Sequence, residues 1–520
     1  MKETSLGKLQ KTVDKQEKQI INLQELVKVR KEKYRLLQLK YNYLEKNIKK
    51  TVEREVNSRC ETIQKENESL KEEILRLRAL LNTDSNNSEI PTSKTPVGKN
   101  KRILNSREKT GRSVGGQAGH EKHKLKKFDD EELTDSCYYE IDKCPCGGKL
   151  KETGERTKDE LDIEIRVKKI RHYFKEYECL CCGKKIQVPI PEHLKEENQY
   201  GSNVKALALS LINEGCVSYN RTRNLINGFS SNQIDISEGY LVKQQKKASQ
   251  KLEQFIKELK QRIIKEKVIH WDDTVIMVNA NRGCLRFYGT EQLALYTVHE
   301  KKNKEGLDLD SILNVLDKDT VVVHDYNTVN YNEDYEFQNA ECCVHLIRDL
   351  EKLKEELNRE WAEELIVLLK ETNQERKKYI SQGNEYFEEL FIEEVQNKYD
   401  DIISKAKEIN KKEYNSYFGQ EEKALINRLI KYKENYLMWV IRFDVPFSSN
   451  LSERSLRGSK TKMKVSGQFK NIENARYYSN IKSYIETCKR NSINVHEALV
   501  RLSENNPFTI EEIFEEKNSD

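Results

Sequence analysis

The spacing of apolar residues over the first 82 positions constrains this chain more than any other feature. Large side chains recur in alternating steps of three and four residues, the spacing of a coiled-coil seam. An extra four-residue step between Ile48 and Ile63 is a stutter, and Asn67 falls at an a position, where a buried Asn favours two strands. Because the seam is too long for one helix packed on its own protein, residues 1–82 are predicted to self-associate. The seam consists of Leu6, Leu9, Val13, Gln16, Ile20, Leu23, Val27, Arg30, Tyr34, Leu37, Tyr41, Leu44, Ile48, Val52, Val56, Cys60, Ile63, Asn67, Leu70, Ile74, Leu77 and Leu81.

Residues 83–130 are predicted to form a basic, flexible linker. Between Lys94 and Lys127 there are eleven Lys and Arg against two Glu, and the stretch has too little apolar surface to order itself. Its charge has two interpretations that remain open, which are solubility and contact with DNA phosphates. The segment also contains the glycine-rich patch Gly115–His120.

Two cysteine knuckles within residues 131–195 predict a small, β-rich zinc-binding module. The chain has no apolar run of the roughly 20 residues needed to span a bilayer and no signal peptide, so we expect a cytoplasmic protein with reduced thiols. Structural Zn²⁺ takes four tetrahedral ligands, here Cys144, Cys146, Cys179 and Cys182. The first knuckle is one residue shorter than usual, so Cys137, Cys181 or a His remains an alternative ligand, as does a set of reduced core cysteines.

The periodicity changes twice after the knuckles. Residues 196–266 are helical in pattern and include a Gly-containing turn, which is compatible with DNA binding. Residues 267–349 have the order β-β-β-α-β-(α)-β, which predicts an antiparallel meander extended by parallel strands, an α/β core with a mixed sheet. The strands are predicted at Val268–Val278, Cys284–Tyr288, Leu293–Val298, Thr320–Val323 and around Cys342–Val344. Residues 350–444 are predicted to be a helical insertion, and residues 445–520 to complete the core with C-terminal helices.

Three carboxylates lie at positions that are typical of catalytic residues. Asp272, next to Asp273, lies inside a strand-forming run, where an unpaired carboxylate is costly to bury. Asp325 follows an apolar strand, and Glu453 lies at a helix start. Three convergent carboxylates can hold two Mg²⁺ ions, although turn and helix-capping roles explain the same positions. The basic residues around the helix are predicted to contact DNA phosphates: Arg454, Arg457, Lys460, Lys462 and Lys464.

In their order along the chain, these motifs resemble the insertion-sequence 66 family of bacterial transposases over nearly the whole length. The matching motifs are Gly115–His120, the two knuckles, Asp272-Asp273-Thr274, His324-Asp325-Tyr326, Cys342 to His345 with Arg348, Asn450–Arg454, Lys464–Gly467, and Tyr484–Lys489 with Asn491.

The resemblance implies a ribonuclease-H-like core and an Asp-Asp-Glu enzyme. It implies that Asp272, Asp325 and Glu453 hold two Mg²⁺ (or Mn²⁺) ions, cut DNA at transposon ends and join the 3′-hydroxyl to target DNA. Asp273 stands where the family usually has Glu, so either acid of the pair could be the ligand. Cys342 and His345 resemble a Cys-x-x-His pair, for which a place beside the site and core packing are both open.

The resemblance also sets expectations for partners. The expected partners are DNA, a second copy of the chain and accessory proteins encoded by the element. The expected location is the bacterial cytoplasm, near the nucleoid. Two rival functions remain: a nuclease on the same fold that never joins ends, and a non-enzymatic coiled-coil DNA-binding protein.

Overall fold

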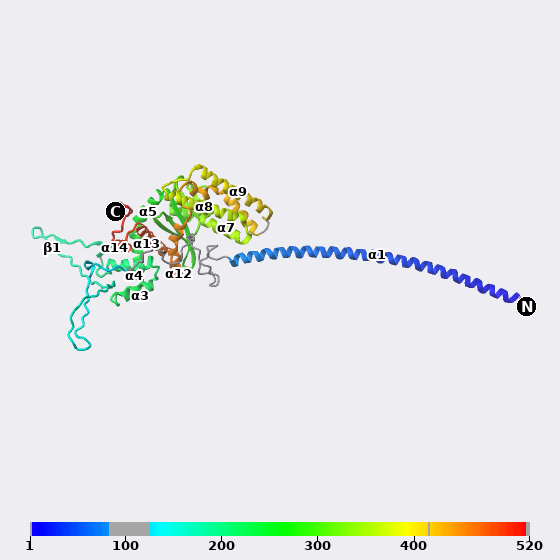
Figure 1. Ribbon diagram of the computed structural model, residues 1–520, viewed down its shortest axis with the longest axis horizontal. Helices are drawn as coiled ribbons and strands as arrows, with labels where there is room; N and C mark the ends of the chain where they lie inside the picture. Colours follow the sequence, from blue (N-terminus) through cyan, green and yellow to red (C-terminus); the bar gives the residue numbers. More distant parts are fainter. Residues whose placement is uncertain (1–2, 83–124, 195, 414–416, 516–520) are drawn as a thin grey trace. The chain divides into compact units, whose positions relative to one another are not determined.

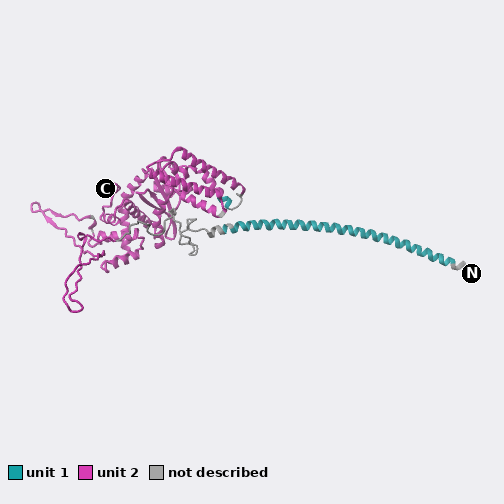
Figure 2. Cartoon of the chain, viewed as in Figure 1, with its two compact units in different colours: residues 1–84, 413–421 teal, residues 85–412, 422–520 magenta. Residues whose placement is uncertain are grey.

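The computed structural model describes residues 3–82, 125–194, 196–413 and 417–515. The chain divides into two compact units, residues 1–84 with 413–421 and residues 85–412 with 422–520 (Figure 2). Most of the predicted linker, including the patch Gly115–His120, lies outside the described residues.

A single long helix, α1 (Glu3–Asn82), occupies the segment with the heptad seam (Figure 1). It runs without interruption because no Pro or Gly follows Gly7 within it, so nothing removes a backbone hydrogen bond. The large apolar side chains of the seam from Leu6 to Leu77 are exposed, as at Leu37, which is 67% accessible. The predicted helix is confirmed, whereas its pairing with a second helix stays a prediction.

The cysteine segment contains little regular structure. Strands β1 (Glu176–Glu178) and β2 (Lys185–Gln187) form an antiparallel hairpin around the second knuckle. Residues 149–175, which have a strand-like sequence, form no strand, and their apolar side chains Ile163 and Ile170 are exposed. The prediction of a β-rich module is therefore wrong for the described residues, because this segment has no core on which a sheet could pack.

Helices follow the cysteine segment, as the periodicity indicates. Hydroxyls of Ser218 and Ser237 accept hydrogen bonds from the first turns of α3 and α4 and so set where these helices begin. Buried Ile212, Ile226 and Leu241 pack α2, α3 and α4 together. The helices are α2 (Ser202–Asn213), α3 (Tyr219–Phe229), α4 (Glu238–Lys251) and α5 (Glu253–Ile264).

A five-stranded mixed sheet is the centre of the second unit, which confirms the predicted sheet. Its strand order is β5-β4-β3-β6-β7, antiparallel from β5 to β3 and parallel from β3 to β7. The strand predicted at Cys342–Val344 is wrong, because the last strand ends at Glu341 and Cys342 is the N-cap of a helix. The strands are β3 (Val268–Val278), β4 (Asn281–Gly289), β5 (Ala294–His299), β6 (Val321–His324) and β7 (Gln338–Glu341).

Between β5 and β6 the chain forms the short helix α6 (Lys304–Asp310), and after the sheet it forms the helical insertion. The insertion buries apolar side chains against Val321, Val323 and Ala340 of the sheet, so it shares a core with β6 and β7. Its helices are α7 (Cys343–Leu357), α8 (Glu360–Ser381), α9 (Glu389–Glu413), α10 (Tyr417–Lys431) and α11 (Lys433–Ile441).

The C-terminal segment returns to the sheet. Ser483 and Thr487 lie on α13 (Ile472–Arg490), and their hydroxyls accept hydrogen bonds from Tyr296 N–H (2.8 Å) and Ala294 N–H (3.2 Å). These bonds pair two backbone N–H groups of the edge strand β5 that no neighbouring strand pairs. The helices are α12 (Asn450–Ser466), α13 (Ile472–Arg490), α14 (Val495–Ser503) and α15 (Ile510–Glu515). Among the helices described, none is long and apolar enough to cross a membrane.

Candidate active site

Asp272 and Asp325 lie level with one another on neighbouring parallel strands. Val268 pairs with Val321 and His270 with Val323, so the same register continued by two positions brings Asp272 beside Asp325. Asp325 comes directly after β6, at the carboxyl end of a parallel strand. Both side chains are partly buried and therefore remain reachable from solvent.

The two carboxylates disfavour each other's charge. Burial and the neighbouring charge of Asp325 raise the pKa of Asp272 well above its ordinary value, and Lys460 opposes the shift. Positive charge placed beside such a pair of acids is therefore stabilising. Among the parts of the chain that the structure describes, however, no group of three or more His, Cys, Asp or Glu side chains is arranged to hold a metal ion.

Glu453 lies in the first turn of α12 and is held by cations of α7. His345 Nε2 lies 3.2 Å from Glu453 Oε1, and Arg348 donates to the same oxygen at 3.4 Å. Burial opposes protonation of His345, but Cys342, Asp325 and Glu453 raise its pKa to about 9. His345 thus faces both Asp325 and Glu453, which places the third acid at the same end of the sheet.

Cys342 joins the sheet to the helix that carries Glu453. Its sulfur accepts a hydrogen bond from the backbone N–H of Ser449, the N-cap of α12, at 3.2 Å. Burial would raise the pKa of the Cys342 thiol, but hydrogen bonds with His345 and Ser449 lower it. The Cys-x-x-His pair therefore lies beside the acids, with its sulfur at one end of α12 and its imidazole against Glu453.

Asp273 points to the opposite face of the sheet. Asp272 lies opposite Phe287, which packs against Leu456 of α12, whereas Asp273 lies opposite Arg286. The Asp273 carboxylate lies 2.7 Å from Lys302 Nζ and accepts a hydrogen bond from the Cys284 thiol. Alternation along β3 thus separates the two adjacent acids, and only Asp272 faces Asp325.

Four of the five predicted DNA-contacting residues are exposed on α12: Arg454, Arg457, Lys460 and Lys464. Arg457, Lys460 and Lys464 lie in line with Glu453 because they follow it by four, seven and eleven residues. Lys460 is also close enough to lower the pKa of Asp272. A basic face therefore extends from the acids along the helix.

Lys462 does not belong to this face, and its predicted contact with DNA is wrong in this structure. Nine residues after Glu453, it lies about 180° around the helix, since each residue turns about 100°. Its side chain is buried, and Nζ donates to the carbonyls of Ile212 (3.1 Å) and Val217 (3.2 Å). Lys462 therefore links α12 to the end of α2 and to the loop after it.

His270 also belongs to the face of Asp272, although no sequence motif singled it out. It is buried two positions before Asp272 on β3, and its Nδ1 has no hydrogen-bond partner. Burial, and then the charges of Arg490 and Arg454, lower its pKa to about 4, so the imidazole is neutral near pH 7. The two-residue period of a strand could have indicated its place beside Asp272.

The two cysteine knuckles each form a tight turn. The Gly147 N–H donates to the Cys144 carbonyl at 2.7 Å, and the Gly183 N–H donates to the Cys179 carbonyl at 2.8 Å. A hydrogen bond with the Cys144 sulfur and hydrogen bonds from backbone amides lower the pKa of Cys146, and hydrogen bonds from the amides of Cys182 and Cys181 lower that of Cys179. Each turn stabilises a thiolate, but the described residues do not bring the two pairs together as one metal site.

The profile of a known protein family, described as "Transposase IS66 family", matches residues 198–477. The chain belongs to this family. The matched segment contains the whole five-stranded sheet, the helical insertion and α12, and hence Asp272, Asp325 and Glu453. A search of curated proteins finds no match. Membership makes the chain a transposase-family protein, while the knuckles and α1 lie outside the matched segment.

Proposed function

We propose that this transposase-family protein cleaves DNA at transposon ends and joins the freed 3′-hydroxyl to target DNA. The observation that carries the proposal is the pair Asp272 and Asp325, level on neighbouring parallel strands, with Glu453 on the helix that covers the same face. The strand order, with three antiparallel strands followed by two parallel ones, supports a ribonuclease-H-like core.

The acids fit a divalent cation such as Mg²⁺ or Mn²⁺. Carboxylate oxygens are the ligands such hard ions take, and the mutual repulsion of Asp272 and Asp325 is relieved by positive charge. When bound there, two metal ions supply Lewis-acid activation of the attacking oxygen and stabilisation of the leaving oxygen. Asp272 and Asp325 would hold them, and Glu453 would join by exchanging its contacts with His345 and Arg348.

The chain's own residues would position the DNA. Lys460 and Lys464 carry positive charge from the acids along the exposed face of α12, which suits a phosphate backbone. Arg348 is 38% exposed, so it can turn from Glu453 to a phosphate oxygen. Cys342 keeps the start of α12 against the end of β7, which fixes the height of Glu453 above the sheet.

An assay with uncut and with pre-cut transposon ends, each with a target plasmid, tests the proposal. We expect joined products in Mg²⁺ or Mn²⁺ and none in a chelator. Cleavage of uncut ends without any joined product would instead support a nuclease on the same fold, and neither product would support a DNA-binding protein without catalysis.

We also propose that the knuckles hold a structural Zn²⁺ through Cys144, Cys146, Cys179 and Cys182. The tight turns that favour thiolates at Cys146 and Cys179 support this role. Metal analysis of the purified chain should find about one zinc per protomer, and Cys179→Ser should lose it. Purified protein without zinc would contradict the assignment.

A further inference from the structure

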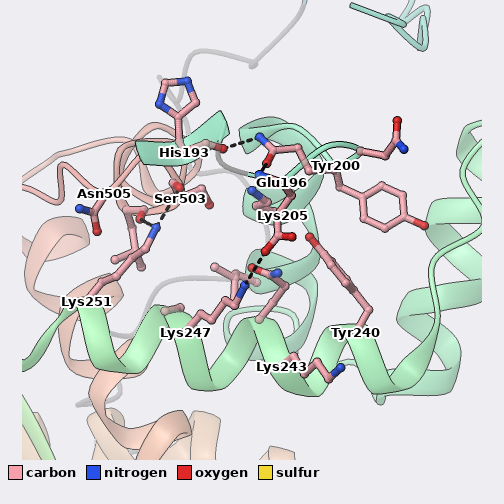
Figure 3. Close-up of a pocket in the computed structure, with 16 residues that line it drawn as sticks. His193, Glu196, Tyr200, Lys205, Tyr240, Lys243, Lys247, Lys251, Ser503 and Asn505 are labelled. Carbon is pink, nitrogen blue, oxygen red and sulfur yellow. Dashed lines mark hydrogen bonds and ion pairs between the residues drawn. The ribbon is translucent and has the colours of Figure 1, made fainter. Parts of the chain in front are cut away.

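A lysine-rich pocket lies between α2, α4 and the end of α14, on residues that the active site does not use (Figure 3). Its volume is about 790 Å³, far more than one water or inorganic phosphate needs and within the range of ligand pockets. Lys243, Lys247 and Lys251 line it from α4, and Lys205 lines it from α2. We infer that this pocket binds the phosphodiester backbone of a DNA strand.

The positive charge of the pocket exceeds its negative charge. The only carboxylate among its described lining residues is Glu196, 3.9 Å from Lys247 Nζ. Lys251 Nζ donates to the carbonyls of Leu502 and Ser503 and so caps the end of α14. Lys205, Lys243 and Lys247 therefore face one carboxylate, an excess that a phosphate backbone balances.

Lys205 is held close to a second cation. Burial, and then the charge of Lys247, lower the pKa of Lys205, while Glu196 opposes the shift. Three lysines converge here on Glu196, the single carboxylate among the described lining residues, and this excess of cations favours an anionic ligand. Figure 3 shows the ion pair between Lys247 and Glu196 in the pocket that Lys205 also lines.

One wall of the pocket is aromatic. The rings of Tyr200 and Tyr240 pack edge to face with centroids 4.8 Å apart. Burial raises the pKa of both hydroxyls, so neither tyrosine adds negative charge near neutral pH. Lysines beside an aromatic surface can hold a backbone while sugars or bases contact the rings, a combination that a free phosphate does not use.

The spacing along α4 shows why the lysines gather on one side. Tyr240, Lys243, Lys247 and Lys251 recur every three or four residues, so they share one face of the helix. Lys246 lies on the same helix but is exposed and does not line the pocket. It provides a charge-matched control on the same element.

The inference rests on the proposed function, since it assigns part of the same DNA substrate to this pocket. The test measures binding of a fluorescein-labelled DNA duplex to the full chain over a series of salt concentrations. Lys205→Gln with Lys247→Gln should weaken binding severalfold and reduce the slope of log affinity against log salt by roughly 0.9 for each phosphate that the variant no longer neutralises. Lys246→Gln with Lys257→Gln, two exposed lysines outside the pocket, should leave both values as in the wild type.

Equal salt slopes and affinities for the two double variants would overturn the inference. The inference would also be overturned if Lys205→Gln with Lys247→Gln lost binding of pyrophosphate but kept the wild-type salt slope of DNA binding. That result would indicate a pocket for a small anion. Lys247→Arg keeps the charge and should retain binding, and matching melting temperatures exclude unfolding. The joining assay with Asp272→Asn separates the two proposals. If only the pocket inference fails, the wild type still joins DNA ends and Asp272→Asn does not. If the proposed function fails, Asp272→Asn gives the same products as the wild type.

Discussion

Adjacent acids in this chain have different partners because a strand sends successive side chains to opposite faces. Asp272 shares its face with Asp325, and Asp273 forms an ion pair with Lys302 on the other. The Lys302 side chain is 55% exposed, so this ion pair contributes at most about 1 kcal/mol to stability. Substituting Asp272 and Asp273 one at a time therefore separates an effect on DNA cleavage from an effect on stability.

Asp272→Asn should reduce cleavage of transposon ends by more than about 100-fold, because losing a direct ligand costs more than losing an outer one. Asp273→Asn should retain cleavage and lower the free energy of unfolding by about 1 kcal/mol at most. Rates of strand cleavage and denaturant unfolding of both variants measure these effects. Equal loss of cleavage in the two variants would contradict the assignment of Asp272.

The buried Lys462 predicts a pH dependence of stability. Burial lowers its pKa from 10.5 to about 8, and the neighbouring Cys216 opposes the shift. The unfolded chain therefore binds this proton more strongly, so Lys462 makes stability rise with pH between about 8 and 10.5 and has no effect on the slope below about 8. Over that window the wild type should gain on the order of 3 kcal/mol relative to Lys462→Met.

Unfolding free energies of the wild type and Lys462→Met at a series of pH values measure this difference. The exposed Lys464→Met on the same helix is the control and should follow the wild type at every pH. A constant difference between wild type and Lys462→Met would show that the lysine is not perturbed.

At the scale of elements, α12 has two chemically distinct faces. One carries Glu453 and the exposed cations, and the other packs Leu456 against the sheet and Lys462 against the end of α2. The sequence alone shows that this helix is basic, but whether each cation lies on the exposed face with Glu453 depends on its angle around the helix.

Replacing Arg457, Lys460 and Lys464 together by Ala should weaken DNA binding and reduce its salt slope by roughly 0.9 for each phosphate no longer neutralised. Folding should be unaffected because the three side chains are exposed. Binding of a labelled duplex at several salt concentrations measures the slope. The control replaces three exposed lysines of α9, which should change the slope little: Lys398, Lys405 and Lys411.

At the scale of the whole molecule, α1 predicts self-association. Its seam exposes a long row of apolar side chains, and a second copy of the same helix would cover it. Ile20→Asp with Val27→Asp, both in the seam, should raise the dissociation constant of the full-length oligomer at least about tenfold, since each buried carboxylate is costly.

The matched control substitutes Ile21→Asp with Val29→Asp, which are apolar and exposed but outside the seam. Light scattering at several protein concentrations should find the control as associated as the wild type. A wild-type chain that is monomeric at all concentrations would contradict the predicted coiled coil.

Periodic features were readable from the sequence because they depend on neighbouring residues. The long helix and the strand Val268–Val278 match their predicted positions, since spacing and breakers act locally. The polar strand Gln338–Glu341 was missed because its place in the sheet depends on pairing with β6. The apolar run Cys342–Val344, which predicts a strand, instead lies at the start of α7.

The choice of the three acids began in the sequence, where a strand interior, a strand end and a helix start marked Asp272, Asp325 and Glu453. Tertiary structure alone decided which member of the pair at 272 and 273 faces Asp325, because that depends on strand register. It also decided that Lys462 is buried and that His345 contacts Glu453. Local order along a chain follows from its own residues, whereas contacts between distant segments exist only once a sheet sets them side by side.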